Sequence, residues 1–311
     1  MGKLLEGKVA LITGAGRGIG REHAIMMAEH GAKIVVNDLG GDEFGGPGSL
    51  TAAQEVVAEI DSMGGQAVVN CGNVARFDEA KKMVEQAIET FGDINIVVNN
   101  AGILRDRMIF SMSEDDWDTV LAVHLKGTFG PTHHAAAYWR SKVKAGEEAY
   151  GRVINTASPS GIYGNVGQSN YGAAKAGIAA FSIIAAQELV KYGVTVNCLA
   201  PTAVSRLTIP LLGGEENLTE VAREAMSPRW IAVVTTWLAS PEASNVTGRV
   251  FDVRGEQLGI AQGWHLGPTA TQPDNPSELG PVMAELMSQA RLNAGMDGVE
   301  REGPGFPSHS I

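Results

Sequence analysis

Short runs of β-branched residues alternate with longer segments of helical periodicity along most of the chain. Runs such as KVALIT and KIVVND are apolar at consecutive positions, as expected for strands that are buried on both faces of a sheet. Parallel strands need helical crossovers, so the pattern predicts a parallel sheet between two layers of helices. Further strands are predicted in QAVVNC, INIVVNN, GRVINTAS, VTVNCLAP and 249–253, and helices at 18–31, 49–64, 77–91, 113–139, 169–192 and 228–240.

Two segments interrupt this alternation. The sequence GGDEFGGPGS at 40–49 predicts a glycine-rich loop after the second strand. The stretch 256–311 is rich in Pro, Gly and Asn and has one helix-like piece, ELGPVMAELMSQARLNA. We therefore expect one domain over 1–255 that includes the substrate site, followed by an extension over 256–311 that packs on the body or on a neighbouring subunit.

Composition narrows the possible partners and the compartment. Charged residues make up 19% of the 311 residues, the formal net charge is −11, and no basic run occurs, which argues against a nucleic-acid partner. No uncharged stretch approaches the length of a bilayer span and no signal region precedes VALITG, so no membrane partner is expected. Only Cys71 and Cys198 occur, too few for a disulfide framework, which favours a cytoplasmic location with both cysteines buried.

A glycine-rich turn after the first strand predicts a dinucleotide site. Gly14, Gly18 and Gly20 fit the spacing T-G-x-x-x-G-x-G, in which backbone amides and a helix N-terminus can approach a pyrophosphate. Asp38 ends the second strand 24 residues after Gly14, close to the spacing at which a carboxylate binds the ribose hydroxyls of NAD. Arg17 in the loop could meet the 2′-phosphate of NADP, or could contact the pyrophosphate or solvent. The carboxylate decides the prediction in favour of NAD.

Tyr171 and Lys175 lie four residues apart on a predicted helix and thus on one face of it. A phenol has a pKa near 10, and a neighbouring ammonium together with the positive nicotinamide is expected to lower it enough for Tyr171 to act as a general base. Ser158 follows the strand GRVINTAS, at the sheet edge where ligands bind, and could polarise a substrate oxygen. The alternatives are a surface lysine beside a half-buried tyrosine, and a turn serine held extended by Pro159.

These motifs together resemble the short-chain dehydrogenase/reductase family. TGAGRGIG, NNAG at 99–102, Ser158 with Y-x-x-x-K, and LASPEASNVTG at 238–248 carry the resemblance, which covers the chain up to about residue 255. It implies a seven-stranded Rossmann-type doubly wound sheet, a nicotinamide cofactor, a Ser/Tyr/Lys mechanism, and a homodimer or homotetramer. It also implies that Asn73 and Val74 flank adenine, that Asn99, Ala101 and Gly102 border the adenosine ribose and central strands, that Val204 faces the nicotinamide amide, and that Arg17, Ile19, Pro201, Tyr171 and Lys175 contact the cofactor.

A narrower resemblance concerns the substrate. VVNDLGGDEFGGPGS, NNAGILRDR and SGIYGNVGQSNYGAAK are similar to the (3R)-hydroxyacyl-CoA dehydrogenase domain of the peroxisomal multifunctional enzymes and to bacterial relatives that act on fatty or steroid-side-chain CoA thioesters. The hydratase and sterol-carrier domains of the multifunctional enzymes have no counterpart in this sequence, and the tail after 255 follows no pattern of the family.

Several residues keep two interpretations. His124 stands where many family members have an asparagine, and it either holds a water or backbone contact in the proton path or is a packed helix histidine. Arg105 and Arg107 either meet a CoA phosphate or pair on the surface with Asp106 or Glu114. The segment 205–220 is a candidate substrate lid or a surface loop without a catalytic role. His133 and His134 are adjacent on a helix and point apart, so no metal site is expected.

The sequence therefore predicts an oxidoreductase in which Ser158, Tyr171 and Lys175 act catalytically, with His124 as a further candidate, and hydride passes from a lipophilic or CoA-thioester alcohol to NAD. Three alternatives remain: a steroid or other lipophilic alcohol dehydrogenase, an NADPH-dependent ketone reductase, and a nucleotide-binding redox sensor without catalysis.

Overall fold

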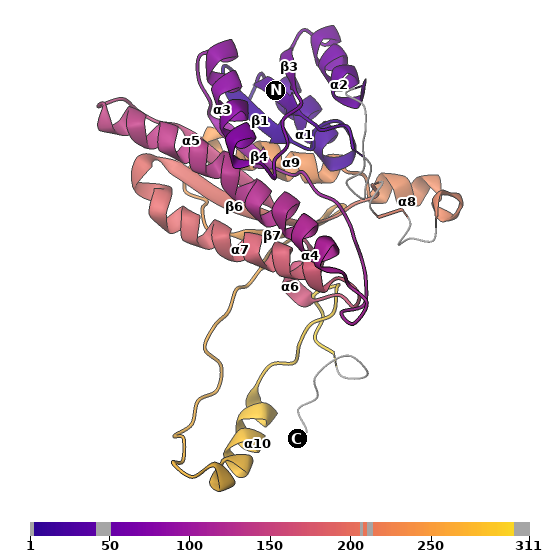
Figure 1. Cartoon of the computed structure of the whole chain (residues 1–311), viewed down its shortest axis with the longest axis vertical. Coiled ribbons are helices and arrows are strands. Elements are labelled where there is room, and N and C mark those ends of the chain that lie inside the picture. Colours follow the sequence, from indigo (N-terminus) through magenta and orange to yellow (C-terminus); the bar gives the residue numbers. More distant parts are fainter. Residues whose placement is uncertain (1–2, 42–50, 206–207, 210–213, 302–311) are drawn as a thin grey trace.

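The computed structural model describes residues 3–41, 51–205, 208–209 and 214–301, and these form a single sheet covered by helices, with an extension that leaves the body (Figure 1). The strand order is β3-β2-β1-β4-β5-β6-β7-β8, parallel throughout except for the antiparallel pair β7–β8. The strands are β1 Val9–Thr13, β2 Lys33–Asn37, β3 Gln66–Asn70, β4 Ile96–Asn99, β5 Gly151–Thr156, β6 Val194–Thr202, β7 Val250–Arg254 and β8 Gln257–Ala261.

The predicted Rossmann-type α/β/α sandwich is confirmed, with eight strands instead of seven. The added strand, β8, turns back from β7 after two residues, so the first part of the segment interpreted as an extension belongs to the sheet. The helices are α1 Gly18–Glu29, α2 Thr51–Ser62, α3 Phe77–Phe91, α4 Glu114–Leu121, α5 Gly127–Lys144, α6 Pro159–Tyr163, α7 Ser169–Leu189, α8 Glu220–Ala225, α9 Arg229–Leu238 and α10 Leu279–Gln289.

Both faces of the sheet are buried, which explains the continuous apolar runs. In β1, Ala10 and Ile12 pack into a core with α1, α2 and α9, whereas Val9 and Leu11 pack into a second core with α3, α5 and α7. Successive side chains of a strand point to opposite faces, so a strand between two helical layers needs apolar residues at every position. Each fully buried Val, Leu or Ile side chain contributes about 1.5–3 kcal/mol relative to leaving it exposed.

The helix expected over 113–139 is interrupted. Ser113 begins α4 with a capping box, since its hydroxyl accepts from the backbone of Asp116 and the carboxylate of Asp116 accepts from the backbone of Ser113. A π-helical turn, Ala122–Lys126, then separates α4 from α5. Such a turn holds one residue more than an α-helical turn, and here it carries the buried His124.

Within the part of the chain that the structure describes, one helical stretch is long and apolar enough to span a bilayer by length and composition, namely α7 with the turn after it, Ser169–Tyr192. This stretch contains the buried Lys175, and α7 packs against β6 and α6. Its apolar residues therefore also serve as core residues of the sandwich, in the way expected of a central helix in a three-layer fold.

After β8 the chain runs away from the body to α10 and returns towards α6 (Figure 1). No residue of α10 is buried. On the return, Gly298 lies against the ring of Tyr163, whose hydroxyl donates to Asp252 of β7. The two cysteines differ from expectation in one respect, because Cys198 is buried but Cys71 is exposed.

Candidate active site

The carboxyl ends of β1, β2 and β4 border a cavity of about 390 Å³. Ligands of a doubly wound sheet bind at this edge, where the strand order reverses. Here β1 lies between β2 and β4, so the following strands are added first on one side of β1 and then on the other. The described residues that line the cavity are Gly14, Arg17, Gly18, Ile19, Asn37, Asp38, Leu39, Gly41, Gly72, Asn73, Val74, Ala75, Asn100, Ala101, Gly102, Ile103, Thr119, Ala122, Val123 and Ser205.

The glycines of the loop after β1 are required by close packing. Gly14 has a φ of 64°, and a Cβ at this position would stand 2.8 Å from the Cα of Ala101. A Cβ at Gly20 would stand 2.1 Å from the carbonyl oxygen of Gly14. The side-chain amide of Asn100 donates to that same oxygen at 3.1 Å. The loop is thus pressed onto the end of β4, and its backbone borders the cavity without intervening side chains, which fits a pyrophosphate.

Asp38 is held in place by backbone amides. Its Oδ2 accepts from the N–H of Gly16 at 2.8 Å and its Oδ1 accepts from the N–H of Gly40 at 2.7 Å. Each carboxylate oxygen has two acceptor positions, so both can still accept a bond from a ribose hydroxyl in the cavity. Gly16 was outside the predicted spacing, and its role depends on a contact between the loop and β2 that only the fold creates.

Most residues predicted to bind the cofactor line the cavity, and some do not. Asn99 is buried behind it, where its amide donates to Asn155 and Thr132. Val204 is bonded through its backbone to Met226, and its neighbour Ser205 reaches the cavity instead. Gly20 lies beneath the loop. Those that line the cavity are Gly14, Arg17, Gly18, Ile19, Asp38, Asn73, Val74, Ala101 and Gly102, whereas Gly20, Asn99, Pro201, Val204, Tyr171 and Lys175 do not.

Ser158, Tyr171 and Lys175 come together beyond the end of β5. Ser158 begins α6 and accepts from the N–H of Ser160 at 3.2 Å. The Lys175 Nζ lies 5.5 Å from the centre of the Tyr171 ring and donates to the carbonyl of Thr156 at 2.6 Å. The predicted shared face is therefore present, and the ammonium, the phenol and the hydroxyl converge on one region.

Burial dominates the pKa values of Tyr171 and Lys175. Burial raises the pKa of the Tyr171 phenol to about 12, although the hydrogen bond from Ser158 lowers it in part. Burial also lowers the pKa of the Lys175 ammonium to about 8. Without the dinucleotide, the ammonium therefore does not bring the phenol pKa below its ordinary value, and the predicted lowering by the ammonium together with the nicotinamide stays a prediction. A buried pair of this kind is dominated by loss of hydration, which opposes both charged forms.

His124 makes the backbone contact that was one of its two interpretations. Its Nε2 lies 2.8 Å from the carbonyl oxygen and 3.1 Å from the amide nitrogen of Ile103, and its ring meets the Tyr171 ring edge-on at 5.1 Å. A Cβ on Gly102 would stand 2.5 Å from the imidazole. Burial, followed by the charge of Lys175, holds the pKa of His124 well below its usual value, so the ring is neutral.

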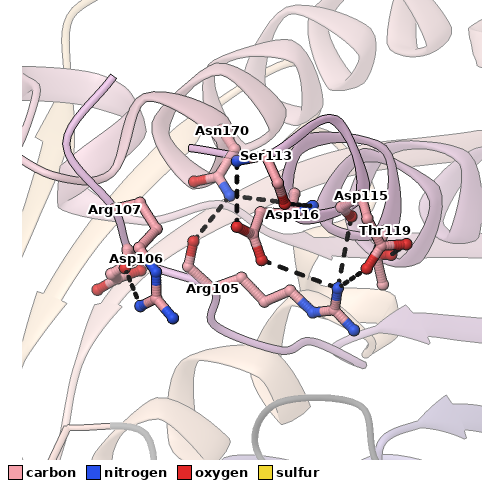
Figure 2. A network of polar contacts seen from close by, with 8 residues as sticks. All are labelled: Arg105, Asp106, Arg107, Ser113, Asp115, Asp116, Thr119 and Asn170. Carbon is pink, nitrogen blue, oxygen red and sulfur yellow. Dashed lines mark hydrogen bonds and ion pairs between the residues drawn. The ribbon is translucent and has the colours of Figure 1, made fainter. Parts of the chain in front are cut away.

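Arg105 is engaged in ion pairs, but with other partners than expected. Its guanidinium pairs with Asp115 and Asp116 of α4, as Figure 2 shows, instead of Asp106 or Glu114. Arg107 donates to the backbone carbonyl of Asp106. The predicted lid at 205–220 lies in part outside the described residues, as does the glycine-rich loop at 40–49.

Sequence reasoning missed one buried polar residue of this region, Asn170. It has no exposed surface and bonds to the backbone of Arg105 and of Asp116. Its position directly before Tyr171 was the only signal in the sequence that could have drawn attention to it.

Comparisons with known proteins identify the family. The family model for short chain dehydrogenases matches residues 8–208. The chain is 41% identical over 268 residues to hydroxyacyl-CoA dehydrogenase ChsB1 of Mycobacterium tuberculosis, covering 84% of this chain and 82% of that protein. It is 45% identical over 255 residues to the peroxisomal multifunctional enzyme type 2 of Mus musculus, covering 82% of this chain but only 32% of that longer protein.

A solved structure shows the same fold. The crystal structure of a short chain dehydrogenase from Mycobacterium avium superposes with a TM-score of 0.83 at 46% sequence identity, covering 94% of this chain and 98% of that chain. The body up to β8 ends at residue 261 of 311, so the match also includes part of the extension.

Proposed function

Since this chain belongs to the short-chain dehydrogenase family and is an oxidoreductase that uses a nicotinamide dinucleotide, we propose that it oxidises the secondary alcohol of a 3-hydroxyacyl-CoA thioester with NAD. The observation that carries the proposal is the convergence of Ser158, Tyr171 and Lys175 beside the dinucleotide cavity. The thioester class is supported by two relatives of 41% and 45% identity, one named a hydroxyacyl-CoA dehydrogenase and the other a peroxisomal multifunctional enzyme.

In the proposed reaction, Tyr171 removes the proton of the substrate hydroxyl while Ser158 donates a hydrogen bond to the same oxygen. The carbon that bears the hydroxyl gives up its hydrogen as a hydride, and the products are a ketone and the reduced dinucleotide. When bound, the oxidised dinucleotide supplies the hydride acceptor and a positive charge near the phenol. The Lys175 ammonium lies 5.5 Å from the centre of the Tyr171 ring.

The high pKa of the phenol fits this proposal if the positive charges act together. Burial raises the pKa of Tyr171 to about 12, and a nearby positive charge favours the phenolate most strongly where water is excluded. The same burial therefore makes the base responsive to the oxidised cofactor. His124 fixes the loop at Ile103 next to the base, and this contact favours a positioning role for the histidine.

The preference for NAD over NADP is supported by Asp38. Its carboxylate lines the cavity, and two backbone amides fix it there. A 2′-phosphate at this position would meet a like charge, whereas a 2′-hydroxyl can donate to the carboxylate. Arg17 also lines the cavity, and we assign it to the pyrophosphate side.

The decisive experiment follows NADH appearance with matched (3R)- and (3S)-hydroxyacyl-CoA thioesters, the corresponding free hydroxy acids and hydroxysteroids. We expect turnover of a thioester to exceed that of its free acid by at least tenfold in kcat/KM. Preference for a free hydroxysteroid would favour the second candidate, a lipophilic alcohol dehydrogenase. Faster turnover with NADPH and a ketone would favour a reductase and contradict the role given to Asp38.

We further propose that the extension packs on a neighbouring subunit of a homodimer or homotetramer. In α10, Leu279, Val282, Met283 and Leu286 follow the spacing of one helical face, yet none is buried within the chain. A helix of 11 residues is marginal in water without a packing partner. Apolar side chains are also exposed on α5, at Phe129, on α7, at Ile184, and in the turn after α7, at Val190.

Light scattering after size exclusion tests this arrangement. Leu286→Glu places a charge on the apolar face of α10 and is expected to lower the mass of the assembly or weaken it on dilution. Glu285→Gln changes the neighbouring exposed residue and is expected to leave the mass unchanged. An unaltered assembly in Leu286→Glu would remove α10 from the interface. A cytoplasmic location also remains a proposal, tested by fractionation of cells.

A further inference from the structure

The residue directly before the proposed base is a buried asparagine with a fully engaged amide. Asn170 has no exposed surface, and its Nδ2 donates to the carbonyl of Arg105 at 3.0 Å and to the carbonyl of Asp116 at 3.1 Å. Its Oδ1 accepts from the backbone N–H of Tyr171 at 2.7 Å. One side chain thus joins three segments, namely the loop after β4, α4 and the first turn of α7, as Figure 2 shows for Arg105 and Asp116.

The loop after β4 is the link between this asparagine and the dinucleotide cavity. Asn100, Ala101, Gly102 and Ile103 line the cavity, and Arg105 follows two residues later. His124 binds the backbone of Ile103 and meets the ring of Tyr171 edge-on. The loop is therefore connected to the base twice, through the histidine at Ile103 and through Asn170 at Arg105.

Neighbouring contacts fasten the same turn of α7. Gln168 donates from its side-chain amide to the carboxylate of Asp106 at 2.7 Å, and the N–H of Arg107 donates to the carbonyl of Gly167 at 2.9 Å. Asp116, whose carbonyl receives one bond from Asn170, is held by its capping box and by Arg105. The two carbonyls that accept from the Asn170 amide are thus themselves held in place. Because the Oδ1 of the same side chain binds the backbone N–H of Tyr171, Asn170 fixes Tyr171 relative to these carbonyls.

We propose that Asn170 is a positioning residue for the reaction, whose amide holds Tyr171 in register with Ser158 and with the loop that borders the dinucleotide. The inference rests on the proposed role of Tyr171 as the base. The residue type is specific, because an amide of this size supplies two donors to two carbonyls and one acceptor to an N–H. An aspartate would place a carboxylate against both carbonyls, and an alanine would remove all three hydrogen bonds.

Asn170→Asp is the main test, because the side chain keeps its size and its acceptor but loses both donors. We expect kcat for the alcohol that the wild type oxidises to fall about tenfold to hundredfold, while KM for the alcohol and the Kd of NADH change less than threefold. Asn170→Ser keeps a short hydroxyl and is expected to recover part of kcat. Asn245→Asp is the control and is expected to leave kcat unchanged, since Asn245 is exposed before β7 and takes no part in these contacts.

A second measurement does not depend on the substrate. In protein labelled with 3-fluorotyrosine, the ¹⁹F resonance of Tyr171 is assigned by its loss in Tyr171→Phe. The charged or titratable groups that face this phenol are Lys175 of α7, His124 of the π-helical turn and Asp106 of the loop, and Ser158 donates to it. With NAD bound, we expect Asn170→Ser to shift the resonance and raise its titration midpoint, because the phenol moves from the Ser158 hydroxyl.

The outcomes separate this inference from the proposed function. A ¹⁹F resonance and titration midpoint of Tyr171 unchanged in both Asn170 variants would overturn the positioning role, as would a kcat loss that follows only the folded fraction. If the wild type oxidises none of the alcohols, the proposed function fails, and the resonance still decides the role of Asn170.

Discussion

The cleft has a dinucleotide half, around the loop after β1, and a catalytic half, around Tyr171 and Lys175. Their buried polar groups differ in whether they have hydrogen-bond partners. Around the loop after β1, each oxygen of Asp38 accepts a backbone N–H, and the Asn100 amide donates to the Gly14 carbonyl. In the catalytic half, the buried Nδ1 of His124 and the buried Oγ1 of Thr156 have no partner among the described residues. The polar groups of the loop after β1 are thus paired within the chain, whereas the catalytic half contains groups whose partners the described chain does not supply.

The pKa values follow the same division. Burial raises the pKa of Tyr171 to about 12 and lowers that of Lys175 to about 8, and both residues belong to the catalytic half. Perturbed ionisable groups cluster where chemistry needs them, because only loss of hydration gives a nearby charge a strong effect. His23 of α1 is the exception on the dinucleotide side. It is buried with a pKa of about 3, so it is a neutral packing residue.

The largest expected effect comes from Tyr171→Phe, which removes the proposed base and little else. We expect turnover to fall about 10³-fold, within the range for loss of a general base. NADH binding, measured by fluorescence, should change less than threefold because Tyr171 does not line the cavity. Unchanged turnover would remove the phenol from the mechanism, and a parallel loss of NADH affinity would mean that the two halves are not separable.

Asp38→Asn is the converse test, directed at the dinucleotide half alone. Loss of the negative charge should shift the ratio of kcat/KM for NAD to that for NADP about tenfold to hundredfold towards NADP, as expected for one close charge in a partly solvated site. The control is Asp61→Asn, because Asp61 is exposed on α2. A ratio that stays constant would assign cofactor choice to other groups of the cavity.

Lys175→Met tests whether the buried ammonium of the catalytic half destabilises the folded state. The folded-state pKa of Lys175 is about 8, below its ordinary 10.5, so the folded state disfavours the ammonium. The resulting destabilisation is complete below pH 8 and fades as pH rises to 10.5. At pH 7 we expect the free energy of unfolding to increase by about 1–2 kcal/mol, since the lost bond to the Thr156 carbonyl offsets part of the gain.

Denaturant unfolding at pH 7 and pH 10 measures this difference. The gain should shrink at the higher pH, and Lys82→Met, which changes an exposed lysine of α3, should show neither effect. A variant less stable than the wild type at pH 7 would mean that the ammonium stabilises the folded state, and the contrast between the two halves would then need another cause.

The sequence was sufficient for the layers of the fold and for the glycine loop. Continuous apolar runs can be accommodated only between two helical layers, and Gly14, Gly18 and Gly20 mark a turn without side chains. It was not sufficient for β8, because QLGIA is short and its pairing depends on the edge that β7 offers. It was also insufficient for the π-helical turn at His124, since one inserted residue hardly alters a helical period.

Residue type and local spacing determined which groups could do the chemistry, namely a phenol and an ammonium one helical turn apart and a serine at the end of a strand. The tertiary structure alone decided how those groups ionise and what holds them, because hydration is lost only when segments distant in sequence close around Tyr171. Asn170 shows the same dependence, since both carbonyls that its amide binds belong to residues more than 50 positions away.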